Sequence, residues 1–209
     1  MLQNVYINKK KVPVPVPITG LRDAISWTED FLVKPGYSLT RIELDGDLID
    51  FDGADRLENM PLSNTSKLFL QLDSAADMCV QILDTLKHLT SLHKHSLQQI
   101  AVRCWTWREK DTPTGVVAVY EDMQMILDLA LSFMDLADDK VYKKSLNDHI
   151  KSLESLTQML ELAMNENNWK ACAKILLNKF EPLIEVLGDE YSRLSTPVFE
   201  WQIEFKKRA

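Results

Sequence analysis

Glycine and cysteine are scarce in this chain of 209 residues, which contains six glycines and three cysteines. Loops that bind phosphate need glycines so that backbone N–H groups can approach the anion closely. No Gly-rich phosphate loop, Gly-x-Ser-x-Gly elbow or Cys-x-x-Cys pair occurs. The cysteines, Cys79, Cys104 and Cys172, are odd in number and lie among helical apolar residues, which indicates buried thiols in a reducing cytoplasm rather than disulfides.

An excess of basic charge and a long hydrophobic run are also missing. The chain has 24 Lys and Arg against 31 Asp and Glu, a net charge of −7, which argues against nucleic-acid binding. Its most apolar helical stretch, residues 123–137, contains two aspartates and is shorter than the ~20 residues that a bilayer span requires. No apolar run of a secretory signal begins the sequence. We therefore expect a cytoplasmic protein with no membrane span.

Prolines and branched aliphatic residues alternate between Val12 and Ile18, with prolines at 13, 15 and 17. In an extended strand this pattern removes three N–H donors from the same edge, so the segment could pair through one side only. The pattern predicts an edge strand. A polyproline II ligand is the alternative interpretation.

The remainder of residues 1–73 predicts a strand at 4–8, a helix at 21–32, a hairpin of 37–44 and 48–51 around Asp45-Gly46, and a last strand at 67–72. This order, with the segments 41–49 and 62–70 as its second half, resembles the β-grasp (ubiquitin-like) fold. The resemblance implies that the second strand lies at the sheet edge. It implies no function, and because the chain runs on into a helix, a conjugated modifier is excluded.

An acidic cluster occupies the predicted hairpin and the residues after it. An EF-hand loop that starts at Asp45 or Asp47 would have Ile49 or Phe51 at its fifth, ligating position, so neither register fits calcium. We expect a solvated hairpin tip, with a docking surface for a basic partner as the alternative. The cluster comprises Glu43, Asp45, Asp47, Asp50, Asp52, Asp55 and Glu58.

Residues 74–195 carry apolar residues at helical spacing in four segments, at about 74–107, 116–134, 142–163 and 169–187. Short connections between amphipathic helices predict an antiparallel, up-down-up-down four-helix bundle. We expect Pro182 to kink the fourth helix. The predicted fold class is therefore α+β, with a small β-grasp domain followed by a four-helix bundle.

The four histidines, His88, His93, His95 and His149, form no pattern of metal-ligand spacing. His93 and His149 lie on or beside apolar stripes and are expected to be core histidines. A histidine phosphotransfer domain is also a four-helix bundle, but its motif places Lys three residues after the His, and no histidine here has one. We expect no catalytic, cofactor-binding or metal-binding residues and no enzyme activity.

Residues 196–209 contain a strict alternation of apolar and polar residues, with Phe199, Trp201, Ile203 and Phe205 as the apolar set. Alternation of period two favours a strand or extended tail over a helix opened by Pro197. Such a strand could pair with the β-grasp sheet or with another chain. Trp201 and Phe205 are the expected anchors of an interface.

Together these features predict a non-catalytic adaptor or chaperone-like protein that binds another protein through Phe199, Trp201, Ile203 and Phe205. Surplus apolar positions such as Phe133, Met159 and Met164 suit an adaptable binding surface. In helix count, acidity and Met content the second half is similar to flagellar export chaperones, which implies a bacterial motility or secretion assembly. Alternatives are a phosphotransfer-like signalling bundle and a carrier or enzyme that uses the bundle interior. A homodimer also fits, and no cofactor is expected.

Overall fold

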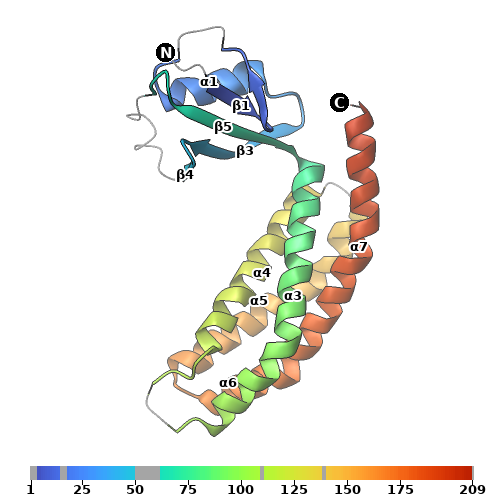
Figure 1. The fold of residues 1–209 in the computed structure, drawn as a ribbon. Helices are drawn as coiled ribbons and strands as arrows, with labels where there is room; N and C mark the ends of the chain where they lie inside the picture. Colours follow the sequence, from blue (N-terminus) through green and yellow to red (C-terminus); the bar gives the residue numbers. More distant parts are fainter. Residues whose placement is uncertain (1–3, 15–17, 50–61, 109–110, 138–139, 209) are drawn as a thin grey trace. The chain divides into compact units, whose positions relative to one another are not determined.

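The structure, a computed structural model, describes residues 4–14, 18–49, 62–108, 111–137 and 140–208. The chain divides into two compact units, Met1–Ala75 and Ala76–Ala209 (Figure 1). The first contains the sheet and the second consists of helices, so the fold is α+β. The predicted boundary, after residue 73, lies two residues before this division.

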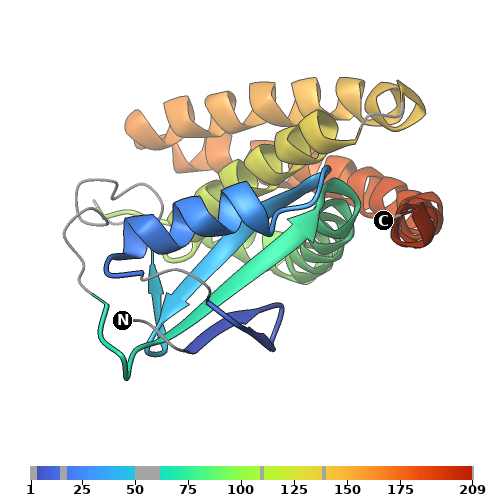
Figure 2. The same ribbon diagram turned by 90° about the horizontal axis from the view of Figure 1, so that it is seen from above.

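The first unit, hereafter the sheet unit, contains a five-stranded sheet in the order β2-β1-β5-β3-β4. The strands are β1 (Asn4–Ile7), β2 (Lys10–Val12), β3 (Tyr37–Leu44), β4 (Asp47–Ile49) and β5 (Lys67–Ser74). β1 and β5 are parallel and the other neighbours are antiparallel. Helix α1 (Leu21–Phe31) lies across one face of the sheet (Figure 2). This mixed sheet is compatible with the expected β-grasp-like start.

Two tight turns set the register of the hairpins. Asn8 and Lys9 join β1 to β2, and Asp45 and Gly46 join β3 to β4, all four with positive φ. Two-residue loops of this conformation match the right-handed twist of paired strands. The Asp45-Gly46 turn is thus confirmed, and Asp45 Oδ1 also accepts a hydrogen bond from the Lys67 backbone N–H at 2.7 Å.

The proline-rich segment is an edge strand only in part. β2 is at the sheet edge, as expected, but it ends at Val12, immediately before Pro13. A proline has no N–H to continue the ladder, which explains why pairing stops there. The predicted strand through residue 18 is therefore too long in its described part, since Pro13 and Val14 are not in a strand. Residues 15–17, and most of the acidic cluster, lie outside the described residues.

The core of the sheet unit is aliphatic apart from Trp27. It comprises Val5, Ile18, Leu21, Ala24, Trp27, Ile42, Leu62, Leu68 and Leu70. Alternate residues of β5 are buried, as expected for a strand with one face against a helix. The buried Thr28 hydroxyl donates to the Ala24 carbonyl at 2.8 Å, so it carries no unsatisfied donor into this core.

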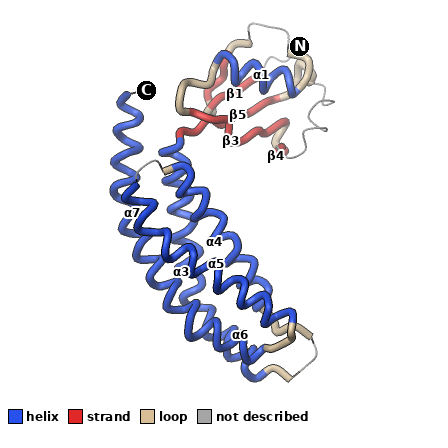
Figure 3. The backbone as a smooth tube through the Cα atoms, turned by 180° about the vertical axis from the view of Figure 1, so that it is seen from behind, coloured by secondary structure: helices blue, strands red, loops and turns tan. Residues whose placement is uncertain are grey.

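The second unit, hereafter the helical unit, contains α3 (Ala75–Thr106), α4 (Val116–Leu136), α5 (Lys140–Asn165), α6 (Trp169–Ile175), the π-helical η1 (Leu176–Phe180) and α7 (Glu181–Arg208) (Figure 3). The first three correspond to the first three predicted helices. Two close approaches fix α3 against its neighbours. Gly115, before α4, packs against Ile100, and Gly188 of α7 packs against Thr90.

Pro182 lies two residues after the end of η1, where the last helix departs from α geometry. The Glu181 N–H donates to the Leu176 carbonyl five residues back, rather than four. In an α-helix the proline ring would clash with the carbonyl four residues before it. The wider π turn relieves that crowding, so the irregularity expected at Pro182 takes the form of a π segment on its N-terminal side.

The prediction of a strand or tail at residues 196–209 is wrong. α7 continues without a break from Glu181 to Arg208, with Pro197 inside it. In a helix, residues four apart share a face, so alternation over seven residues produces two i, i+4 pairs on opposite sides. The alternating pattern is therefore compatible with a helix whose two faces meet different surroundings.

Candidate functional site

The four predicted partner-binding residues lie on two different faces of α7. Phe199 and Ile203 form one pair and are 53% and 39% exposed. Trp201 and Phe205 form the other pair and are half-buried, and Trp201 packs against the helical core. The expectation that Trp201 and Phe205 are the anchors is thus not supported by their burial. Of these four residues, Phe199 is the exposed aromatic one.

A groove of about 450 Å³, hereafter the α3–α7 groove, lies beside Phe199. It is lined by Val80, Leu83, Asp84, Lys87, Ser195, Thr196, Val198, Phe199 and Glu200. Its α3 residues were missed by the sequence analysis. Periodicity places Leu83 on an apolar stripe but does not say which helix that stripe meets.

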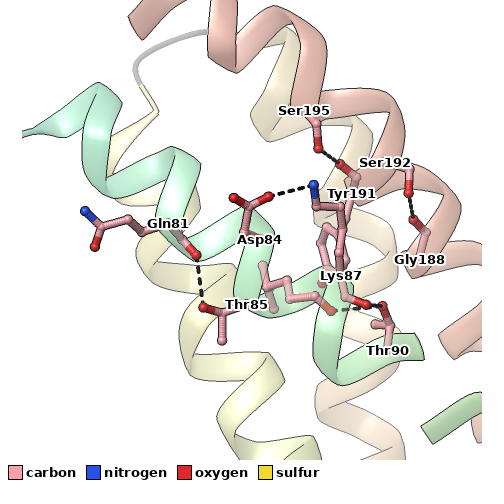
Figure 4. A network of polar contacts seen from close by, with 10 residues as sticks. Gln81, Asp84, Thr85, Lys87, Thr90, Gly188, Tyr191, Ser192 and Ser195 are labelled. Atoms are coloured by element: carbon pink, nitrogen blue, oxygen red, sulfur yellow. Dashed lines mark hydrogen bonds and ion pairs between the residues drawn. The ribbon is translucent and has the colours of Figure 1, made fainter. Parts of the chain in front are cut away.

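The floor of the groove is apolar and its rim is charged. Leu83 and Val198 are buried at the floor. Asp84 and Lys87 form an ion pair on α3 at 2.7 Å. The Ser195 hydroxyl donates a hydrogen bond to the Tyr191 carbonyl of its own helix at 2.9 Å (Figure 4).

Asp77 ties the last turns of α7 to the first turns of α3. Its Oδ1 accepts a hydrogen bond from Gln202 Nε2 at 2.7 Å and lies 2.8 Å from Lys206 Nζ. The Asp77 side chain is only 13% exposed, so both contacts are partly shielded from water. These contacts hold the helical segment that carries Phe199 and Ile203 against α3.

The histidines do not form a site. His93 is buried on α3, as expected, whereas His88 and His95 are exposed and His149 is half-buried. His93 Nε2 lies 3.0 Å from Asp122 Oδ2 on α4, but neither ring nitrogen makes a well-aligned hydrogen bond to a described residue. Burial lowers the pKa of His93, and the Asp122 carboxylate opposes this in part. No described group of three His, Cys, Asp or Glu residues could hold a metal ion.

All three cysteines are buried as free thiols, as predicted. Burial raises the pKa of Cys79 and of Cys172 to about 12 and that of Cys104 to about 11. Cys104 also contributes to the shift at Cys172, so these two thiols lie within electrostatic range. A thiol with such a pKa carries almost no thiolate at neutral pH and is a poor nucleophile.

The three surplus apolar residues differ from one another. Phe133 is fully buried in the helical core, so its assignment to a binding surface is wrong. Met159 is 38% exposed, and Met164 is half-buried against the core. The spacing of apolar residues at i, i+3 and i, i+4 in the sequence could not predict which of these three residues is buried, because burial depends on which helix packs against them.

A second hollow, of about 570 Å³, lies on the sheet unit and is lined in part by Arg41, Glu43, Gln71 and Asp73. These four polar residues already have partners. Arg41 pairs with Glu43, and the Asp73 carboxylate accepts from Thr40 at 2.6 Å and from Gln71 at 2.8 Å. The α3–α7 groove has the stronger case as a binding site, because Phe199 at its edge is an exposed aromatic side chain, whereas Phe69 in the second hollow is half-buried.

No protein-family model, curated protein or solved structure matches this chain. None of the described helices has the length and apolarity needed to cross a membrane.

Proposed function

We propose that this chain is a non-catalytic adaptor or chaperone-like protein that binds a helical segment of another protein in the α3–α7 groove. In this proposal the sheet unit is a β-grasp domain and the helical unit is an antiparallel four-helix bundle. The observation that supports the binding site is Phe199. It is 53% exposed at the edge of an apolar groove, where an aromatic side chain can act as an anchor.

The shape of the groove favours a helix as its occupant. Two helices that pack side by side leave a channel along their length, and a third helix can place apolar side chains into it at i, i+3 and i+4 spacing. Phe199 and the partly exposed Val80 would meet those side chains. Ile203, one turn after Phe199, extends the same apolar face.

Charge defines the partner further. Glu200 is exposed on the wall of the groove, and the chain as a whole has a net charge of −7. Asp84 is already paired with Lys87, so Glu200 is the carboxylate best placed to meet a new cation. We therefore infer a partner helix with a basic residue next to its apolar face. A subunit of a bacterial motility or secretion assembly is the first class to test.

Site-specific photocrosslinking tests the proposal. The photoreactive residue p-benzoylphenylalanine would replace Phe199, and in a separate variant Leu162 of α5, which is 63% exposed and lies outside the groove. We expect one protein adduct from position 199 in the native host and none at the same mass from position 162. Equal adducts at both positions, or none at position 199, would contradict the proposal.

Binding of the purified adduct partner then provides the quantitative test. Phe199→Ala with Ile203→Ala should weaken binding by about tenfold or more, because truncation of an anchor costs at least ~1.4 kcal/mol. Leu162→Ala is the matched control and should leave the affinity unchanged. An unchanged affinity in the double variant would exclude the groove as the binding site.

A further inference from the structure

The His93–Asp122 contact is a buried, polar link between two helices of an otherwise apolar core. His93 is 2% exposed on α3, and its Nε2 lies 3.0 Å from Asp122 Oδ2 on α4. The Asp122 side chain is 32% exposed, so the carboxylate retains contact with water while the imidazole does not. The contact therefore joins a partly hydrated carboxylate to an imidazole that is shielded from water.

The two ring nitrogens have unequal surroundings. Nε2 faces the Asp122 carboxylate, whereas Nδ1 is buried and meets no hydrogen-bond partner among the described residues. A neutral imidazole carries one N–H, but an imidazolium carries two. Protonation would thus place a second donor, on a cation, in a position where no described acceptor receives it, and that arrangement is costly.

Charged groups of α7 that reach α3 in this region already have partners. On the α7 side, Glu185 pairs with Lys94 at 3.1 Å, and Glu181 accepts a hydrogen bond from Gln98 at 2.6 Å. The Tyr191 hydroxyl of α7 is buried and has no described partner. Of the described groups, only Asp122 of α4 lies at ion-pair distance from the His93 ring.

We propose that the burial of His93 between α3 and α4 makes the packing of these helices sensitive to acid, so that the helical unit loses stability as the pH falls below about 6.5 while the sheet unit does not. All four histidines lie in the helical unit, at positions 88 to 149. The sheet unit therefore has no side chain that ordinarily titrates in this range.

The sign follows from proton linkage. Folding lowers the pKa of His93 through burial, so the unfolded chain binds more protons than the folded chain below the ordinary histidine pKa of ~6.5. The free energy of unfolding therefore has its full value above about pH 6.5. It decreases as the pH falls further, until the pH reaches the pKa of His93 in the folded state. In that window the unfolding constant should rise by up to about tenfold per pH unit.

Urea unfolding of the full chain, followed by far-UV circular dichroism at a series of pH values, tests the proposal. His93→Gln removes the titration and should flatten the dependence. His88→Gln and His95→Gln remove exposed histidines of the same helix and should keep the wild-type slope. A His93→Gln variant with the wild-type slope would overturn the proposal.

Asp122→Asn separates an electrostatic role from a structural one. Without the carboxylate that favours the protonated ring, the folded-state pKa of His93 should fall further, so the acid loss should extend to lower pH. A smaller total loss than in the wild type would contradict the proposal.

An NMR titration of the wild-type histidine rings requires no variant to fold. The His93 ring should remain neutral at pH values just below the ordinary histidine pKa of ~6.5. If the His93 ring titrates at or above about pH 6.5, the proposal is wrong.

Discussion

The two units of this protein differ in the kind of groups that they bury. The sheet unit contains no histidine or cysteine, and its buried Thr28 hydroxyl has a hydrogen-bond acceptor. The helical unit contains every histidine and cysteine, and it buries His93 and the Tyr191 hydroxyl without a well-aligned partner among the described residues. Sensitivity of stability to pH in the range where histidines titrate should therefore be confined to the helical unit.

The largest effect should come from the helical core. Phe133→Ala removes a fully buried ring and should lower the free energy of unfolding by about 3–5 kcal/mol. Hydrogen exchange, measured by mass spectrometry, should show the loss of protection in α3, α4 and α5. Leu68→Ala, in the sheet core, is the reciprocal variant. If Phe133→Ala removed protection equally from β3 and β5, the two units would not be separate in stability.

The next comparison is between the two faces of α7. Trp201→Ala removes a half-buried ring from the core and should lower the free energy of unfolding by about 2 kcal/mol. Phe199→Ala removes an exposed ring and should change it by less than about 0.5 kcal/mol. Urea unfolding measures both. Equal losses in the two variants would contradict the assignment of inward and outward faces.

Removal of each of two buried hydroxyl groups should have a smaller effect on stability, and the two effects should have opposite signs. Tyr191→Phe removes a hydroxyl with no described partner and should raise the free energy of unfolding by about 1 kcal/mol. Thr28→Val removes a bonded hydroxyl and should lower it by a similar amount. Thermal unfolding of both variants, compared with the wild type, checks the signs. Destabilisation by Tyr191→Phe would show that the hydroxyl has a partner.

The smallest expected signal is that of the thiols. At about pH 8 an aromatic disulfide reagent should not react measurably with the folded chain, because burial raises the pKa of Cys79, Cys104 and Cys172 and excludes the reagent. In denaturant three equivalents should react, one for each cysteine. Rapid reaction of one thiol in the folded chain would indicate that the helical unit opens locally.

Sequence patterns predicted regular segments well where one face of the element is buried along its whole length. Apolar residues at three- and four-residue intervals located α3, α4 and α5 to within a few residues. The Asp45-Gly46 pair, which suits positive φ, located the β3–β4 hairpin. Each of these signals is local, because it depends on burial or backbone conformation within a few consecutive residues.

The candidate site could be predicted only in part. Phe199 and Ile203 were identified, but the strand interpretation placed Trp201 and Phe205 on the same face as them. A short alternating run fits a strand and also fits a helix with two apolar sides, and only the surrounding chain decides between these. Val80 and Leu83 could not be assigned to the groove, because their role depends on α7, which is more than a hundred residues away.

The π segment at Leu176–Phe180 determines how the last helix would respond to insertion and deletion. A π turn contains one residue more than an α turn, so this segment has one residue more than a continuous α-helix would need to connect α6 to α7. Deletion of the exposed Asn178, together with Pro182→Ala, would restore an α turn and leave Phe199 on its present face. A one-residue deletion later in α7 would instead rotate everything after it by about 100°. A one-residue insertion or deletion should therefore be tolerated at this turn but not in the rest of the helix.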